Sequence, residues 1–110
     1  MNSWVDIVVA GRDDEAVTDA ALGLLRQGRR VLVVLGEGTP GRALRLRRHL
    51  LEASGAGSRQ LMVMTHAEVV CVAGTARVEA VVIRHSRSGR LSAVNTGAFI
   101  RVPEGPTPSW

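Results

Sequence analysis

The sequence predicts an α/β fold in which a central parallel sheet is followed by a three-stranded antiparallel layer. The first observation is the stretch from Val5 to Leu35, which reads as a buried strand, a tight turn, an amphipathic helix and a second buried strand. The second is an unbroken apolar run at 31–35, typical of a strand covered on both faces. The third is the change after residue 66 from alternating strands and helices to consecutive strands.

The first helix is expected over about 14–27. Asp13 or Asp14 is suited to cap its first turn, and Gly28 stands where such a helix ends. Apolar residues at helical spacing predict its inward face, which is formed by Val17, Ala21, Leu24 and Leu25.

The remaining elements follow from the same patterns. Strands are expected at 5–10, 31–35, 60–64, 67–73, 77–85, 90–94 and 97–102. The second helix is expected from Pro40, after an N-cap at Thr39, to about residue 53. Its inward residues are expected to be Ala43, Leu46, Leu50 and Ala53. The parallel strands are expected in the order third, second, first, with the last strand beside the first. The chain, 1–110, is interpreted as one domain with an irregular, Pro-rich tail at 103–110.

The turn after the first strand lies where such units hold nucleotide phosphates. The dinucleotide-binding pattern is Gly-x-Gly-x-x-Gly/Ala, and here Gly11 and Ala16 occupy its first and last positions, with Arg12, Asp13, Asp14 and Glu15 between them. Asp13 stands at the middle position, where it adds a side chain and a negative charge facing two phosphates. The three acids would also stabilise a helix N-terminus, by about 0.3–1 kcal/mol each, and this structural interpretation is favoured over a modified ligand loop.

Composition and charge argue against several functions. All 14 basic residues are arginine and the formal net charge is +4. The run from Arg42 to Arg48 is interpreted as a solvated helix face, with nucleic-acid binding as the weaker alternative because aromatic residues are nearly absent. No apolar run approaches the roughly 20 residues that span a bilayer, and the N-terminus lacks the basic region of a signal peptide, so a cytoplasmic protein is expected.

The residues that often carry catalysis do not form a site in the sequence. Cys71 is the single cysteine and lies in an apolar strand pattern, which predicts a buried, inert thiol. His49, His66 and His85 have no Cys or carboxylate nearby at metal-ligand spacing. No Gly-x-Ser-x-Gly elbow is present, so neither hydrolysis nor a metal centre is expected.

Several short segments, in this order, resemble the NAD(P)-binding domain of the pyridine nucleotide–disulfide oxidoreductases, and look closest to the low-molecular-weight thioredoxin reductases. The segments are Ile7-Val-Val-Ala-Gly11 before Ala16-Val17, Glu68-Val69 leading to Gly74, Arg77 to Ile83, Ser88-Gly89, and Gly97 to Ile100. The resemblance covers about residues 5–102 and implies a Rossmann-like three-layer domain with an antiparallel crossover layer. It implies a dinucleotide site that comprises residues 11–16 together with Gly36, Glu37 and Arg42.

The departures from that family pattern indicate a degenerate copy. Where NADPH-preferring members carry His-Arg-Arg after the second strand, this chain has Leu35-Gly36-Glu37, and only Arg42 and Ala43 resemble the rest of that motif. Glu37 would repel a 2′-phosphate, which favours NAD(H) over NADP(H). Val102-Pro103 replaces the family's Ile-Gly, and neither the redox C-x-x-C motif nor the FAD domain occurs in these 110 residues.

The leading hypothesis from the sequence is therefore a stand-alone, non-catalytic relative that acts as a structural, regulatory or subunit-forming module. No bound cofactor is expected, and a second copy of the chain or a flavoprotein partner is expected to cover the face that an FAD domain occupies in whole reductases. The alternative hypothesis is a functional NAD(H)-binding subunit of a split flavin-dependent oxidoreductase.

Overall fold

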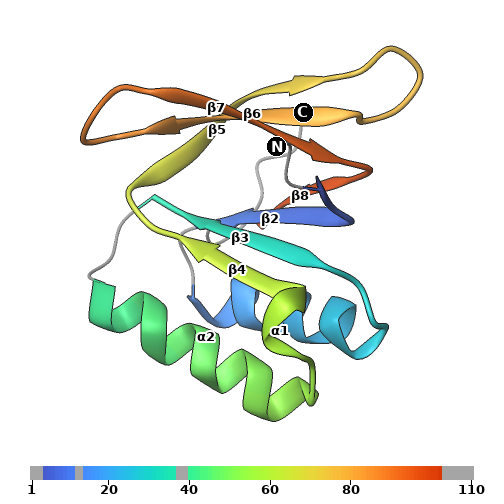
Figure 1. Cartoon of the computed structure of the whole chain (residues 1–110), viewed down its shortest axis with the longest axis vertical. Helices are drawn as coiled ribbons and strands as arrows, with labels where there is room; N and C mark the ends of the chain where they lie inside the picture. Colours follow the sequence, from blue (N-terminus) through green and yellow to red (C-terminus); the bar gives the residue numbers. More distant parts are fainter. Residues whose placement is uncertain (1–3, 12–13, 37–39, 103–110) are drawn as a thin grey trace.

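The computed structural model describes residues 4–11, 14–36 and 40–102, which form three layers. The helices α1 (Asp14–Arg26) and α2 (Pro40–Ser54) lie against one face of a parallel sheet, and a second sheet lies against the other face (Figure 1). This is the expected α/β, Rossmann-like fold class. In the described part of the chain, neither helix is long and apolar enough to span a membrane.

The parallel sheet has the order β4-β3-β2-β8. Its strands are β2 (Ile7–Gly11), β3 (Val31–Leu35), β4 (Leu61–Met64) and β8 (Phe99–Arg101), and every neighbouring pair is parallel. The predicted strand order is thus confirmed, including the last strand beside the first long one. A short 3₁₀ helix, η1 (Ser58–Gln60), leads into β4.

The second sheet has the order β1-β7-β6-β5. Its strands are β1 (Trp4–Val5), β5 (Ala67–Ala73), β6 (Ala80–His85) and β7 (Leu91–Thr96). The strands β5, β6 and β7 are antiparallel, as predicted, whereas β1 joins β7 in the parallel direction.

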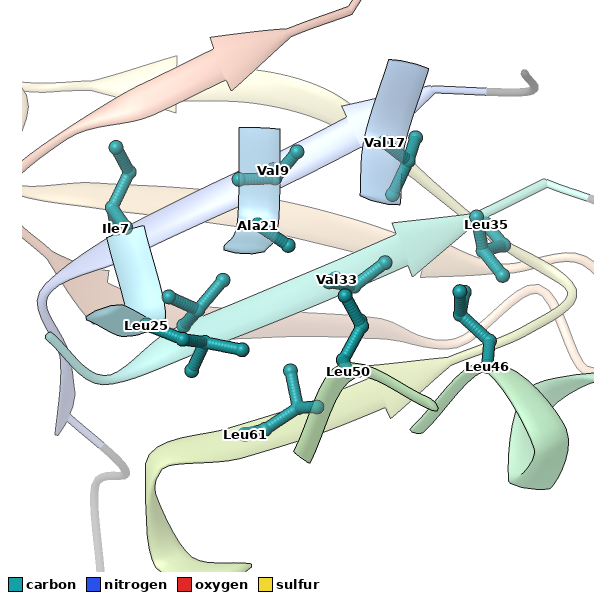
Figure 2. Packing of buried hydrophobic residues seen from close by; sticks show 11 residues of the cluster. Ile7, Val9, Val17, Ala21, Leu25, Val33, Leu35, Leu46, Leu50 and Leu61 are labelled. Atoms are coloured by element: carbon teal, nitrogen blue, oxygen red, sulfur yellow. The ribbon is translucent and has the colours of Figure 1, made fainter. Parts of the chain in front are cut away.

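Alternate residues of β2 and β3 enter two separate cores. Ile7, Val9, Val33 and Leu35 point toward the helices, where Figure 2 shows them meeting Val17, Ala21, Leu25, Leu46 and Leu50. Val31 belongs to the same core cluster. Val8, Ala10, Leu32 and Val34 point the other way and pack with Val69, Val81, Ile83 and Val94 of the second sheet. Because successive strand residues face opposite sides, an unbroken apolar run is what a sheet covered on both faces requires.

The helices begin where the sequence predicted, but three residues expected on their inward faces are not fully buried, since Leu24 and Ala43 are half-buried and Ala53 is exposed. Val17, Ala21 and Leu25 are buried, whereas Leu24 is only half-buried because it lies at the edge of the stripe. In α2, Leu46 and Leu50 are buried and Ala53 is exposed, contrary to expectation. Leu51 packs against the core instead, and a leucine removes more apolar surface from water than an alanine does.

The first expected strand, 5–10, is divided at Asp6 between the two sheets. Residues 4–5 pair with β7, whereas residues 7–11 pair with β3 and residues 8–10 with β8. At the division, the Asp6 carboxylate accepts a hydrogen bond from the backbone N–H of Arg30 at 2.8 Å. The pairing of Asn95 and Thr96 with β1 also explains why β7 runs to Thr96 instead of ending at Val94.

The strand expected from Arg77 begins only at Ala80. The loop between β5 and β6 folds back over Gly74, whose φ is 144° and whose position leaves no room for a Cβ: the carbonyl oxygen of Arg77 would lie 1.9 Å from it. The N–H of Glu79 then donates to the carbonyl of Ala73 at 2.9 Å and closes the loop. Residues 77–79 are therefore used by the loop instead of the strand.

We predict that Leu25→Ala destabilises the protein by about 2–5 kcal/mol, because Leu25 is 2% exposed and its removal leaves a cavity between α1 and the sheet. Leu24→Ala is the matched control, with the same change one residue away, and should cost less than half as much. Urea unfolding followed by circular dichroism measures both free energies. Equal losses would show that the inward face of α1 is misassigned.

Candidate functional site

The candidate site lies at the carboxyl edge of the parallel sheet. Gly11, the last residue of β2, is in register with Leu35, the last residue of β3, so Gly36 follows at the same edge. The helix α1 begins at Asp14, only three residues after Gly11. A helix N-terminus directly after a parallel strand presents backbone N–H groups and a partial positive charge, which is the geometry that binds anions.

Gly11 is required by packing at this edge. A Cβ on Gly11 would lie 2.9 Å from the side chain of Val17 and 3.2 Å from both Cβ and the carbonyl oxygen of Val102. Val102 is held there because its N–H donates to the carbonyl of Ala10 at 2.7 Å, which continues the pairing of β8 with β2. The first glycine of the dinucleotide pattern therefore has a structural role that needs no nucleotide.

The other predicted site residues fall into two groups. Ala16 is half-buried and Glu15 is exposed, both in the first turn of α1, while Arg42 is half-buried in the first turn of α2. Gly36 is half-buried, and a Cβ there would meet nothing within 4 Å. Arg12, Asp13 and Glu37 lie outside the described residues, as do Thr39 and the tail at 103–110.

The charges expected at this edge are mostly negative. The chain places Asp13, Asp14, Glu15 and Glu37 in the two segments that follow β2 and β3, against Arg12 and Arg42. The backbone geometry thus suits an anion, whereas the sequence at the same edge supplies carboxylates.

The thiol of Cys71 is exposed, so the prediction of a buried cysteine is wrong. Val69 faces the core, but the register of β5 against β6 shifts between Val69 and Cys71, and the strand beyond the shift is exposed. An apolar sequence pattern does not reveal such a bulge.

Two of the three histidines, His85 and His66, form side-chain hydrogen bonds. His85 Nε2 lies 3.1 Å from the hydroxyl of Ser92, and His66 Nε2 lies 3.3 Å from the guanidinium of Arg87. Within the described part of the chain, no group of three or more His, Cys, Asp or Glu residues is placed to hold a metal ion.

A second feature, not singled out in the sequence, lies at the opposite, amino edge of the parallel sheet. An open hollow of about 550 Å³ is lined there by Arg30, Arg47 and Arg59 and by apolar residues at the starts of β3 and β4. The three arginines come from separate parts of the chain, and only Arg47 belongs to the run from Arg42 to Arg48. The sequence indicates this hollow only weakly, namely in that Arg30 and Arg59 each stand shortly before an expected strand.

Known proteins with a similar structure were found, but none with a similar sequence. No protein-family pattern matches the sequence, and no curated protein matches it by sequence. The structure is similar to thioredoxin reductases from Gloeobacter violaceus (TM-score 0.69, 18% identity, 98% of this chain and 31% of that chain) and Streptococcus pyogenes MGAS5005 (TM-score 0.67, 17% identity, 94% of this chain and 32% of that chain). It is also similar to a bacillithiol disulfide reductase from Staphylococcus aureus (TM-score 0.63, 19% identity, 94% of this chain and 30% of that chain).

These similarities show that the chain has the fold of a Rossmann-like domain such as thioredoxin reductases contain. The chain spans less than a third of the length of each of these three enzymes. The comparison therefore concerns one part of those proteins and not their whole reaction.

We predict that Gly11→Ala destabilises the protein by about 1–3 kcal/mol, because the added methyl group overpacks the contact with Val17 and Val102. Gly36→Ala is the matched control at the same edge and should change stability by no more than about 0.5 kcal/mol, because its Cβ enters open space. Thermal and urea unfolding of both variants measure the difference. A neutral Gly11→Ala would show that the closeness of Val17 and Val102 is easily relieved.

Proposed function

We propose that this chain is a relative of the NAD(P)H-binding domain of thioredoxin-reductase-like flavoproteins that no longer binds a dinucleotide tightly and is not itself catalytic. It acts as a structural, regulatory or subunit-forming module beside another chain. The observation that carries this proposal is the conflict at the carboxyl edge of the parallel sheet. At this edge α1 begins three residues after β2 ends, as in a pyrophosphate site, but in the sequence Asp13, Asp14 and Glu15 closely follow Gly11.

The size of the electrostatic conflict supports the loss of binding. In a working site the middle residue of the pattern has no Cβ, so that phosphate approaches the backbone N–H groups. Asp13 removes that clearance and adds a like charge. Two unit charges about 4 Å apart at an effective dielectric near 20 repel by about 4 kcal/mol before salt screening. That is close to a thousandfold in affinity.

The packing at Gly11 supports the same proposal from a second direction. A glycine at position 11 would be evidence for nucleotide binding if the approach of a ligand were its only explanation. The contacts that a Cβ would make with Val17 and Val102 already explain it. The 110 residues also contain a single cysteine, so they cannot form the dithiol of a disulfide reductase by themselves.

Exposed apolar side chains support a role in association. Six large hydrophobic residues are more than a third exposed in the described structure: Leu44, Met62, Val70, Val72, Leu91 and Ile100. Leu44 and Leu91 are the most exposed, at 67% and 63%. A contiguous apolar patch is commonly covered by a partner, and Val70 and Val72 lie close together on β5. A second copy of the chain or a flavoprotein subunit is the partner that this proposal implies.

The alternative function is an NAD(H)-binding subunit of a split flavin-dependent oxidoreductase. The observation that favours it is the geometry that remains: α1 begins three residues after β2 ends, and the space at Gly36 is open. Glu37 is suited to accept a hydrogen bond from a ribose hydroxyl and opposes a 2′-phosphate, so this subunit would use NAD(H). A flavoprotein that co-purifies with the chain would favour this alternative.

We predict that the unmodified chain binds NADH at millimolar concentrations or not at all, and NADPH more weakly still because Glu37 opposes the extra phosphate. Asp13→Gly should strengthen NADH binding by at least about tenfold, since it removes both the charge and the side chain. Isothermal titration calorimetry at near-neutral pH measures these affinities.

Two further variants separate the effect of the Asp13 charge on NADH binding from the effect of its side-chain volume. Asp13→Asn removes the charge alone and should recover only part of the affinity. Asp19→Asn is the matched control, because Asp19 is exposed on the same helix but lies beyond its first turn. Micromolar binding of NADH by the unmodified chain would overturn the proposed function and favour the split oxidoreductase.

We predict that the purified chain self-associates, because a small domain with these exposed apolar residues gains by covering them. Light scattering at tens of micromolar should give a mass of at least twice 11.7 kDa. Leu91→Glu should shift the mass toward the monomer if the second sheet takes part, whereas Arg90→Glu, also exposed and next to it, is the control. A mass of 11.7 kDa for the unmodified chain would contradict self-association.

A further inference from the structure

We propose that the hollow at the amino edge of the parallel sheet binds a small organic polyanion, a molecule that carries a phosphate group or several carboxylates on an apolar body. The hollow is lined by Arg30, Arg47 and Arg59 and measures about 550 Å³. It lies at the opposite ends of β2 and β3 from the Gly11 turn, about 16 Å away along a five-residue strand. The proposal is therefore independent of the function proposed above.

The arginines converge from three elements. Arg30 precedes β3, Arg47 lies on α2, and Arg59 lies in η1 just before β4. A solvated charge run on one helix would not bring such residues around one hollow, so tertiary folding creates this cluster. The apolar part of the lining includes Val31, Leu61 and Val63.

Backbone and side-chain hydrogen bonds hold the frame of the hollow. The guanidinium of Arg47 donates to the carbonyl of Ser58 at 3.0 Å, which links α2 to η1. The Gln60 side chain accepts from the N–H of Gly57 at 3.0 Å and donates to the carbonyl of Arg29 at 3.4 Å. The backbone of Arg30 forms two hydrogen bonds with Asp6: its N–H donates to the Asp6 carboxylate, and its carbonyl accepts from the Asp6 N–H. A frame that is already ordered loses less entropy when a ligand binds.

The charge balance in the hollow favours an anion. Among the described residues that line it, three are arginines and none is acidic. The acidic neighbour that the structure identifies is Asp6, whose carboxylate accepts from the backbone N–H of Arg30. The guanidinium of Arg84 elsewhere in the protein pairs with Glu68, whereas no carboxylate of the described chain pairs with the three arginines.

The chemistry of arginine narrows the class of ligand. Its planar guanidinium matches phosphate and carboxylate oxygens with two parallel hydrogen bonds, and it is weakly hydrated, so it suits a partly apolar site. Nucleic acid is disfavoured because it needs a longer basic track, and usually aromatic side chains on which bases stack, whereas the described lining contains no aromatic residue. A compact anion with an apolar portion fits both the arginines and the apolar residues of the lining.

Calorimetric titration of the full chain at low salt tests this inference, with inorganic pyrophosphate and citrate as probes. We expect millimolar or tighter binding of at least one probe. Pyrophosphate alone would identify a phosphate ligand, citrate alone a polycarboxylate, and both a general oxyanion site. The apolar part of the lining also predicts that phenyl phosphate binds more tightly than inorganic phosphate. Binding of neither pyrophosphate nor citrate would overturn the proposal.

Matched charge variants show where the anion binds. Arg30→Gln with Arg59→Gln should weaken the affinity about tenfold or more, equivalent to about 1.4 kcal/mol. Arg77→Gln with Arg90→Gln removes two exposed positive charges from loops of the second sheet and should change the affinity far less. Arg59→Gln alone is the fallback if the double variant is poorly folded by circular dichroism. Equal weakening by both pairs would show a net-charge effect and overturn the site.

Two controls distinguish this hollow from the Gly11 turn and from a nucleic-acid surface. In the Asp13→Gly variant, Arg30→Gln with Arg59→Gln should remove the same component of pyrophosphate binding as in the unmodified chain, because the turn lies at the other edge of the sheet. A 20-base-pair DNA duplex should bind no more tightly than pyrophosphate. Tighter duplex binding that is lost when Arg30 and Arg59 are replaced would overturn the small-ligand proposal in favour of a nucleic-acid surface.

Discussion

The structure depends on covering two apolar strands on both faces. Every residue of β3, and residues 7–10 of β2, is buried, with exposures of 5% or less. Fully burying a valine or leucine side chain contributes about 1.5–3 kcal/mol, so neither face of these strands can be left in water. The two helices cover one face and the second sheet covers the other. The division of the N-terminal strand at Asp6 follows from the same need, because Val5 packs into the second core while Ile7 packs beneath the helices.

Covering one face with helices also creates the two edges at which the candidate sites lie. Each crossover leaves a strand at its carboxyl end and returns to the next strand at its amino end, so the turns before the helices gather at one edge and the segments before the strands gather at the other. Gly11 and the start of α1 lie at the first edge. Arg30 and Arg59 lie at the second. The fold thus separates an acidic sequence segment from an arginine cluster by the length of a strand.

The two edges differ in backbone geometry and in the charge of their side chains. At the carboxyl edge the backbone is suited to a pyrophosphate, but the adjacent acids oppose one. Both α1 and α2 begin at that edge, so neither presents its N-terminus to the hollow at the amino edge, yet three arginines line the hollow. Similarity of fold to thioredoxin reductases concerns only the backbone arrangement, so it does not decide which edge this protein uses.

The sequence by itself determined the fold class, the strand order and most of the elements, because periodicity and unbroken apolar runs report burial directly. It also identified the conflict at the Gly11 turn, since a glycine pattern and its neighbouring acids are local features. The tertiary structure alone decided that Val102 and Val17 require Gly11, that Cys71 is exposed after a bulge, and that Gly74 draws residues 77–79 into a loop. It alone brought Arg30, Arg47 and Arg59 together. These features arise from contacts between residues far apart in the chain, and no local pattern encodes such contacts.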